Sequence, residues 1–449
     1  MTRTLMLGAL SVLLVAAVIR DPGGAFQSAV QGLAVWWTIV FPGLLPFLVL
    51  SELLLAFGLI HGLGALLEPL MRRLLRLPGA AGWALAVGWT AGFPAGAEAA
   101  ASLTAKGVLT RRQGQRLLAA AHMPSPMLMI VVIGAGFLKR PELGLLIAAA
   151  VWSSALLLAV AEALLDRRSD KAARGLRGGA EAASPDGGTS GNAEALRAGG
   201  LPGGSGARSA VGQDREAGAP ASSGGPPPAW PASAAGSPLD RAAYAMAEAQ
   251  RRDGRSFGQA LGEAVASGVQ KLMAAGGFMI AGSVLAGIAG RLPGAGPLLD
   301  FPGQYEAHLG AYAAGGWLAS LGAPLTAAAI AAVLGWSGWS ALLQAGSAAA
   351  AAGLAFRPFL AARLAHAALA FGAALALWRP LGWLLPQRSA PGLAGAPGDA
   401  AGAAAGQAAW RAADMPPLWP LVPAAALALL LAVGALAALS AAAGRRAAR

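Results

Sequence analysis

The chain has 449 residues, of which 56% are hydrophobic and only 12% are charged. Soluble domains carry about 25% charged residues, so this chain has too few charges to cover a water-exposed surface of its size. The net charge of +12 favours Lys- and Arg-rich cytoplasmic loops and contact with anionic lipids, and no basic run is interleaved with aromatic residues as in a nucleic-acid site. The absence of cysteine excludes disulfides, Fe–S clusters, thiolate zinc sites and cysteine nucleophiles.

Long runs without Asp, Glu, Lys or Arg indicate where the chain enters a membrane. A hydrocarbon core about 30 Å thick takes roughly 20 helical residues to cross. The first apolar run, residues 4–19, follows Arg3 and has no clear small-residue cleavage site before Arg20, so we expect an uncleaved first span. Residues 307–356 are fifty uncharged residues, enough to cross twice. The other charge-free runs are 26–51, 77–97, 117–138, 143–161, 272–290 and 421–443.

Composition divides the chain into two membrane blocks and two polar segments. Residues 166–255 are rich in Gly, Ala, Ser and Pro and have no sustained apolar period, so we expect a disordered insert that closes with a short amphipathic helix around residues 239–251. The basic residues do not agree on one orientation, which the sequence leaves open. The predicted parts are 1–165 (first membrane block), 166–255 (insert), 256–385 (second membrane block), 386–417 (linker) and 418–449 (a final transmembrane helix, 418–443, with a basic tail).

Short motifs recur between the two blocks. Gly88-Trp89-Thr90 matches Gly335-Trp336-Ser337, and at the same offset Arg116-Leu117 matches Arg363-Leu364. Membrane transporters are commonly built from two related halves. The pattern therefore predicts an all-α, polytopic membrane protein with two related helical repeats, and about eight to ten spanning or re-entrant elements.

Helix-breaking residues interrupt four of the apolar runs. Proline removes a backbone donor and clashes with the preceding turn, and in lipid the freed groups must be satisfied by protein or by water in a cavity. A broken helix also exposes N-termini whose dipoles favour anions. A single break is an ordinary kink, but several, two of them at corresponding repeat positions, predict broken or re-entrant helices that meet in a binding site. The breaks lie at residues 41–46, 92–96, 122–126 and 335–340.

The candidate substrate-binding residues are these breaks and the polar groups near them. Arg116 and Arg363 either grip a carboxylate through the guanidinium fork or snorkel to the interface. Glu98 is either a coupling-ion ligand or gate, or an interfacial residue paired with Lys106 or Arg116, and the sequence leaves both open. Tryptophans beside the breaks either stack on a planar substrate or pack in the core. The full set is Trp89, Thr90, Gly92, Phe93, Pro94, Gly96, Glu98, Arg116, Ser125, Pro126, Gly335, Trp336, Ser337, Gly338, Ser340, Gln344 and Arg363.

Nothing in the sequence indicates catalysis or a cofactor. It contains no Gly-x-Ser-x-Gly elbow, no Walker loop, no His-Glu-x-x-His motif and no paired intramembrane carboxylates. The four histidines do not combine at metal-ligand spacing, so no metal site is expected. We therefore expect a protein that is not an enzyme, and ATP-driven transport by this chain alone is disfavoured.

At several of these motifs the chain resembles the YlbJ-type sporulation integral membrane proteins, which carry the nucleoside-recognition (Gate) domain. The resemblance covers both membrane blocks, whereas the insert and the linker depart from the compact family pattern. It implies a role in endospore formation, in which this family is associated with moving dipicolinic acid across the mother-cell-derived outer forespore membrane. The motifs are Gly92-Phe93-Pro94-Ala95-Gly96-Ala97 and residues 36–47, 67–72, 125–130, 335–338 and 358–366.

Dipicolinate is a planar, doubly negative aromatic, which half-helix N-termini, Arg116, Arg363 and nearby tryptophans would suit. The leading expectation is therefore a membrane transporter or export facilitator for a small organic anion, dipicolinate first, that works by alternating access. A non-transporting sporulation membrane scaffold and a nucleoside transporter are the alternatives, the latter suggested by the domain name alone. The expected partners are this anion and membrane lipids, with no nucleic acid. A homo-oligomer, the coupling ion and the direction of flux are left open.

Overall fold

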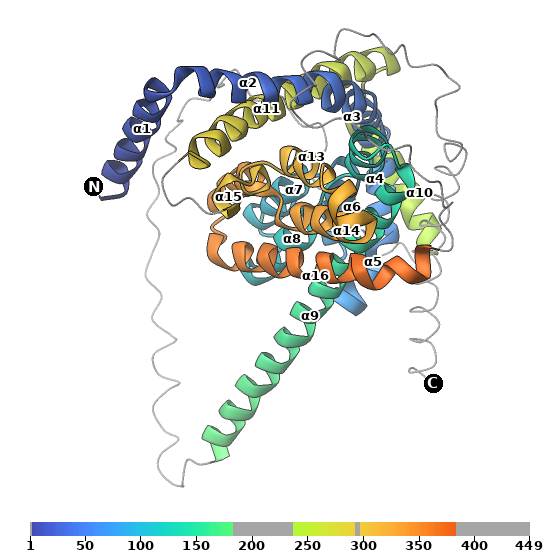
Figure 1. The fold of residues 1–449 in the computed structure, drawn as a ribbon. Helices are drawn as coiled ribbons and strands as arrows, with labels where there is room; N and C mark the ends of the chain where they lie inside the picture. The colour runs from blue at the N-terminus through green and yellow to red at the C-terminus, as the bar shows by residue number, and fades with distance from the viewer. Residues whose placement is uncertain (1, 183–236, 292–296, 383–449) are drawn as a thin grey trace, which may run out of the picture. The chain divides into compact units, whose positions relative to one another are not determined.

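The computed structural model describes residues 2–182, 237–291 and 297–382, and every regular element in these ranges is a helix (Figure 1). The predicted all-α class is confirmed. Five helical stretches within these ranges are long and apolar enough to cross a membrane, as a polytopic membrane protein requires. They are Pro22–Ala56, Pro141–Asp166, Phe257–Ala289, Leu318–Ala351 and Phe356–Leu381.

The chain forms two compact units. The larger unit, Met1–Ala161 with Ser223–Arg449, contains both membrane blocks, and the smaller unit is Glu162–Ser222. Helix α9 (Pro141–Ala182) runs from the larger unit into the smaller one, so the insert predicted at 166–255 begins as helix. Helix α10 (Pro238–Asp253) confirms the short helix expected around residues 239–251. Residues 183–236, the linker at 386–417 and the final helix expected at 418–443 lie outside the described residues.

The first membrane block opens with long helices. The carboxylate of Asp21 accepts a hydrogen bond from the amide of Gly24 (2.9 Å) and thereby caps α2. The break predicted at residues 41–46 is wrong, because helix continues through a π-helical turn into α3. Pro42 lies in the first turn of α3, directly after this π-helical turn, at a position where helices tolerate proline. The elements are α1 (Thr2–Arg20), α2 (Pro22–Val35), η1 (Trp36–Val40) and α3 (Phe41–Ala56).

Short helices occupy the chain between α3 and α9, each too short to cross a bilayer by itself. Two predicted breaks separate them and are confirmed. Gly92-Phe93-Pro94 ends one helix, and His122, followed by Pro124 and Pro126, ends another. The elements are α4 (Leu59–Leu66), α5 (Glu68–Leu70), η2 (Met71–Leu75), α6 (Ala81–Ala91), α7 (Ala95–Ala105), α8 (Arg111–Ala121) and the π-helical η3 (Leu128–Phe137).

The second membrane block divides its long uncharged run into several helices. The break predicted at residues 335–340 is confirmed, with Ser337 (φ 74°) and Gly338 (φ 77°) both in the left-handed conformation. A further bend, which the sequence analysis did not identify, lies at Gly322 (φ 76°). The elements are α11 (Phe257–Ala289), α12 (Pro297–Asp300), the 3-10 helix η4 (Pro302–Gln304), α13 (Ala307–Gly315), α14 (Leu318–Trp336), α15 (Gly338–Ala351) and α16 (Phe356–Gly382).

The two membrane blocks are interleaved within the larger unit. Helices α2 and α3 lie along α11, α4 lies along α10, α7 contacts α15, and α8 contacts α16. Trp36 donates from its indole Nε1 to the carbonyl of Leu272 (2.9 Å), and Gly276 leaves room for the Trp36 ring because a Cβ there would lie 2.5 Å from it. Glu52 forms an ion pair with Lys271. Contacts between the two blocks therefore help to hold the fold together.

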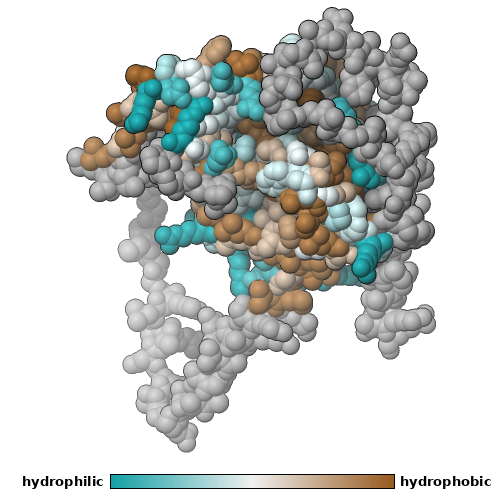
Figure 2. Space-filling view, viewed as in Figure 1, coloured by the Kyte–Doolittle hydropathy of each residue, from teal (hydrophilic) through white to brown (hydrophobic). Residues whose placement is uncertain are grey.

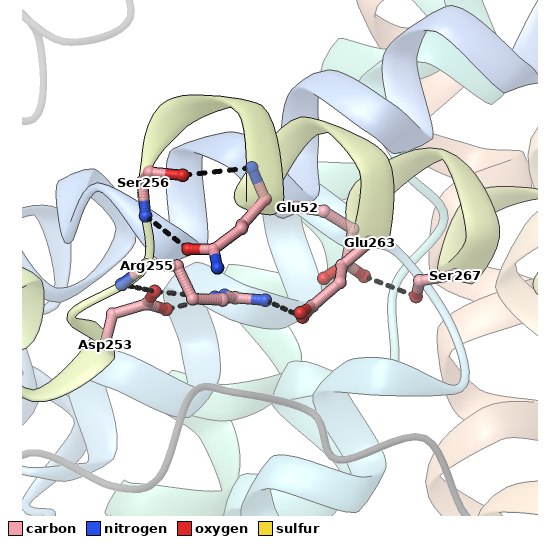
Figure 3. A network of polar contacts seen from close by, with 7 residues as sticks. Glu52, Asp253, Arg255, Ser256, Glu263 and Ser267 are labelled. Carbon is pink, nitrogen blue, oxygen red and sulfur yellow. Dashed lines mark hydrogen bonds and ion pairs between the residues drawn. The ribbon is translucent and has the colours of Figure 1, made fainter.

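A polar junction joins α10 to α11 (Figure 3). Gly254 ends α10 with a positive φ of 65°, which glycine adopts without steric cost. Arg255 then forms ion pairs with both Asp253 and Glu263, and Ser256 caps α11. The hydrogen bond from Arg255 holds the pKa of the Asp253 carboxyl below its usual range. These charges lie before the apolar part of α11, where water or lipid headgroups can solvate them.

Apolar side chains cover much of the described surface on the face in Figure 2. Among the exposed large hydrophobic residues are Leu157, Leu343 and Leu364, on α9, α15 and α16. Such a surface is unfavourable in water but matches the hydrocarbon of a bilayer.

Candidate functional site

Two of the helix breaks meet at a buried contact between the membrane blocks. His122 follows the last turn of α8, and Ser337 forms the turn between α14 and α15. The Nε2 atom of His122 lies 3.1 Å from the Ser337 hydroxyl, and neither residue has any exposed surface. The sequence positions that break helices in the two blocks are thus in direct contact.

Arg363 adds a guanidinium group to this contact from α16. It is 1% exposed, and it donates to the carbonyl of His122 (2.9 Å) and to the carbonyl of Leu334 (3.2 Å). Both carbonyls lie at the ends of helices next to the breaks, where no helical partner is available to them. The Nε of Arg363 has no hydrogen-bond partner among the described residues. Because a guanidinium has five donors, this arrangement leaves capacity for a further acceptor.

Aromatic and imidazole rings surround the same group. Phe93 stacks on the ring of His122 (centroids 5.3 Å apart), and Phe359 meets that ring edge-on (5.2 Å). His366 is one helical turn beyond Arg363 and lies 2.9 Å from the carbonyl of Val151 through Nε2. The Nδ1 atoms of His122 and His366 lack partners within the described part of the chain. Buried polar atoms without partners are rare in proteins and mark a place for a ligand or ordered water.

Glycines allow the broken helices to approach this closely. A Cβ on Gly88 would lie 1.9 Å from the carbonyl oxygen of Ala121, and one on Gly96 would lie 2.0 Å from the same atom. In the second block, a Cβ on Gly335 would lie 2.7 Å from the Cα of Ala367 on α16. Gly88 on α6 and Gly335 on α14 therefore make the same kind of contact with the helix that carries the arginine of their block, α8 and α16.

The predicted site residues of the breaks at 92–96 and 122–126 lie near His122 in the chain or in the fold. Gly92 has a positive φ of 87° and lies close to the backbone of Ser125. A Cβ on Gly92 would lie 2.9 Å from the amide nitrogen of Ser125. Ser125 accepts from the amide of Leu128 (3.2 Å) with its hydroxyl, at the start of the helix after the break. Pro94 precedes α7, and Pro126 lies in the half-buried stretch before η3.

The predicted polar and aromatic residues beside the breaks have protein partners. Trp89 donates to the carbonyl of Ala120 (3.2 Å) and stacks on Trp152, while Trp336 donates to the carbonyl of Gln304 (3.2 Å). These contacts assign both indoles to packing. Three further predicted residues bond to the backbone: Thr90 to Ala86 (2.7 Å), Gln344 to Ser340 (3.1 Å) and the Ser340 amide to Tyr305 (3.0 Å).

Two predicted residues lie apart from the Arg363 contacts. Arg116 donates to the carbonyl of Leu75 at the end of η2. Glu98 is exposed in the first turn of α7. The sequence match between Arg116 and Arg363 therefore does not make them equivalent: one guanidinium binds a helix end and is half-buried, and the other is buried between the blocks.

Three residues of the buried contact were not among the predicted site residues: His122, Phe359 and His366. Local signals existed for two of them. His122 opens the Pro124–Pro126 break, and His366 lies three residues after Arg363, which places both on one helix face. The described residues contain no group of three or more His, Asp or Glu side chains that could hold a metal ion.

Comparison with known proteins finds similarity to a nucleoside-recognition family and to a sporulation membrane protein. The family model "Gate: Nucleoside recognition" matches residues 37–141, which include the breaks at Gly92 and His122. The chain is 28% identical over 398 residues to the "Sporulation integral membrane protein YlbJ" of Bacillus subtilis (strain 168), across 84% of this chain and 83% of that relative. No solved structure matches. Together with the apolar helices described above, these findings support a YlbJ-type sporulation integral membrane protein, with the similarity to the Gate family lying in its first membrane block.

Proposed function

We propose that this chain is a membrane transporter or export facilitator for a small organic anion, with dipicolinate as the substrate, in the outer forespore membrane during endospore formation. One observation carries the proposal. Arg363 is buried between broken helices of both membrane blocks and keeps an unpartnered Nε. A buried cation without a carboxylate in contact is costly, and a bound anion would offset that cost.

The chemistry around Arg363 suits a planar dianion. A guanidinium binds carboxylates through two parallel hydrogen bonds. The rings of Phe93 and Phe359 already flank His122 and can contact an aromatic guest. Because the helices around Arg363 are interrupted, movement of one membrane block relative to the other can open the site around Arg363 to either side of the membrane.

Uptake of labelled dipicolinate into proteoliposomes that contain the full chain tests the proposal. We expect saturable uptake that empty liposomes lack. A non-transporting scaffold would move no dipicolinate, and this result would contradict the proposal.

Variants of two arginines on α16 then test the assignment of the site. Arg363→Lys keeps the charge but loses the fork, and we expect it to weaken dipicolinate uptake by about tenfold or more, since a charge-assisted hydrogen bond contributes roughly 1.5–3 kcal/mol. Arg357→Lys is the matched control, because Arg357 lies on the same helix but is exposed. Equal uptake by the two variants would reject Arg363 as the binding group.

A nucleoside is the second candidate substrate, favoured by the description of the matching Gate family. A nucleoside has a planar base but no charge, so it has less need of a buried guanidinium. Competition separates the two: excess unlabelled dipicolinate should block uptake of the label, and excess uridine or adenosine should not. Inhibition by nucleosides alone would favour the nucleoside transporter.

A further inference from the structure

A carboxylate and an imidazole form a second buried pair, at the start of the uncharged run of the second block. Glu306 caps α13, and its Oε2 accepts from the amide of Leu309 (2.8 Å). Its Oε1 lies 2.5 Å from Nδ1 of His308. Glu306 is 4% exposed and His308 is 7% exposed. Two unprotonated acceptors would repel each other at this distance, so a proton lies between them.

Apart from Asp300 on α12, the other charged groups are distant from the pair in the sequence or paired elsewhere. No Asp, Glu, Lys or Arg occurs in residues 272–290 of α11 or in residues 307–356, which form α13, α14 and α15. Several titratable groups lie on or next to the elements that pack against α13. Two are on or beside α13 itself: Tyr305 (bonded to the Leu299 carbonyl, 3.0 Å) and Tyr312 (packed on Phe137). The others are Asp300 on α12, Glu263 (paired with Arg255), Lys271 (paired with Glu52) and Arg291 (paired with Asp21) on or after α11, Lys139 and Arg140 after η3 (Arg140 paired with Glu142, 2.8 Å), and, beyond Ser337, His122 and Arg363.

The pair can change its charge by one unit. With a single proton, on Nδ1, it carries one negative charge, and with a second proton, on Nε2, it is neutral overall. A net charge in an apolar interior is costly, so the binding of this second proton responds strongly to any other charge that arrives nearby.

Direct packing links the pair to the contact around Arg363. A Cβ on Gly338 would lie 3.0 Å from both the Cα and the N of Glu306, so the backbone of the Ser337–Gly338 turn rests on the backbone of Glu306. The hydroxyl of Ser337 lies 3.1 Å from His122, whose carbonyl accepts from Arg363. A shift of this turn therefore changes the surroundings of both groups.

We propose that Glu306 and His308 form a proton-binding site whose occupancy is coupled, through the Ser337–Gly338 turn, to anion binding beside Arg363. This inference rests on the proposed transport function and deepens it, because it names the proton as the coupling ion. One proton binds with the anion on one side of the membrane, and both are released on the other side. No bond other than those to this proton forms or breaks.

Uptake under an imposed pH gradient tests the coupling in the wild-type chain. Proteoliposomes are held at zero membrane potential with potassium and valinomycin, and labelled dipicolinate is supplied on the acidic side. A gradient of about one pH unit should drive up to about tenfold accumulation, because one coupled proton carries a factor of 10 per unit. Uptake that equilibrates without responding to the gradient overturns the coupling and leaves transport intact. No movement of dipicolinate under any condition overturns the transport proposal and the coupling with it.

Conservative variants locate the proton site. Glu306→Gln and His308→Gln both keep a hydrogen-bonding side chain. The first removes the negative charge that stabilises the second proton on His308, and the second removes the nitrogen that binds it. We expect both to lose gradient-driven accumulation and to keep the exchange of labelled for unlabelled dipicolinate, which also shows that they are folded. The matched controls are Glu142→Gln and His61→Gln, both 8% exposed, which should accumulate dipicolinate like the wild type. Accumulation in the Glu306 and His308 variants equal to that of the controls overturns the assignment. If one of the two variants fails to insert, the other decides the location of the site, and the gradient response of the wild-type chain decides the coupling.

Discussion

Single glycines determine how closely the broken helices pack, and this closeness is what brings His122 to Ser337. A Cβ on Gly88 would meet the backbone oxygen of Ala121 at 1.9 Å, and a backbone atom cannot move aside as a side chain can. We expect Gly88→Ala to destabilise the protein by about 1–3 kcal/mol, the usual cost of overpacking a well-packed interior. Thermal unfolding in detergent measures the effect.

Gly277 on α11 provides the control for this prediction. It is exposed, and a Cβ there would meet nothing within 4 Å. Gly277→Ala should therefore leave the melting temperature unchanged or raise it, because alanine in a helix is favoured over glycine by about 0.5–1 kcal/mol. Equal melting temperatures for the two variants would show that α6 and α8 are not in close contact.

Two substitutions at Ser337 can separate the effect of its left-handed backbone conformation from the effect of its hydroxyl group. A non-glycine residue with φ of 74° is disfavoured, and its hydroxyl contacts His122. Ser337→Gly removes both the steric cost and the hydroxyl, whereas Ser337→Ala removes only the hydroxyl. We expect the glycine variant to be the more stable by about 1 kcal/mol, and both variants to lose dipicolinate uptake to the same extent. Full uptake by Ser337→Gly would mean that the turn matters and the hydroxyl does not.

At the scale of helices, proline and glycine predicted three of the four breaks correctly. The fourth predicted break, at residues 41–46, is wrong. The helix continues there through a π-helical turn just before Pro42, and the sequence does not show where a π-helical turn forms. The bend at Gly322 was not predicted, because glycine in an apolar run is also common in uninterrupted membrane helices. Arg116 and Arg363 share a local motif, but their different partners depend on helices that lie far away in the sequence.

The junction between α10 and α11 should be sensitive to acid. The hydrogen bond from Arg255 lowers the pKa of Asp253, so its stabilising contribution is present above the unfolded-state pKa of an aspartate and is lost as the pH falls through the lowered value. We expect amide hydrogen exchange at the start of α11, corrected for its intrinsic pH dependence, to accelerate below about pH 4. Asp253→Asn should show the faster exchange already at neutral pH. Identical exchange profiles for the two chains would show that the ion pair does not hold the junction.

At the scale of the whole molecule, the sequence predicted a membrane protein in two blocks but not how the blocks fit together. Charge-free runs are a local property, and the crossing of a bilayer depends on length and apolarity alone. The contact between Arg363 and the His122 carbonyl spans 241 residues, and no pattern within either block indicates it. For this reason the break positions could be predicted, whereas the contacts of His122 with Arg363 and with Phe359 emerged only from the fold.

Division of the chain tests whether the two blocks form one unit. A chain cut between residues 182 and 237 gives two fragments that share the pair of Glu52 with Lys271, the bond from Trp36 to Leu272 and the Arg363 contacts. Each fragment alone leaves these groups unpaired, and a buried polar group without its partner costs about 1–3 kcal/mol. We therefore expect either fragment expressed alone to be degraded, and the two expressed together to co-purify and to restore dipicolinate uptake.

The fragment of residues 237–449 carrying Arg363→Ala should associate less well with its partner than one carrying Arg357→Ala, because only the former loses hydrogen bonds across the blocks. Stable, separately purified fragments would show that each block folds by itself and that the interleaved contacts are secondary.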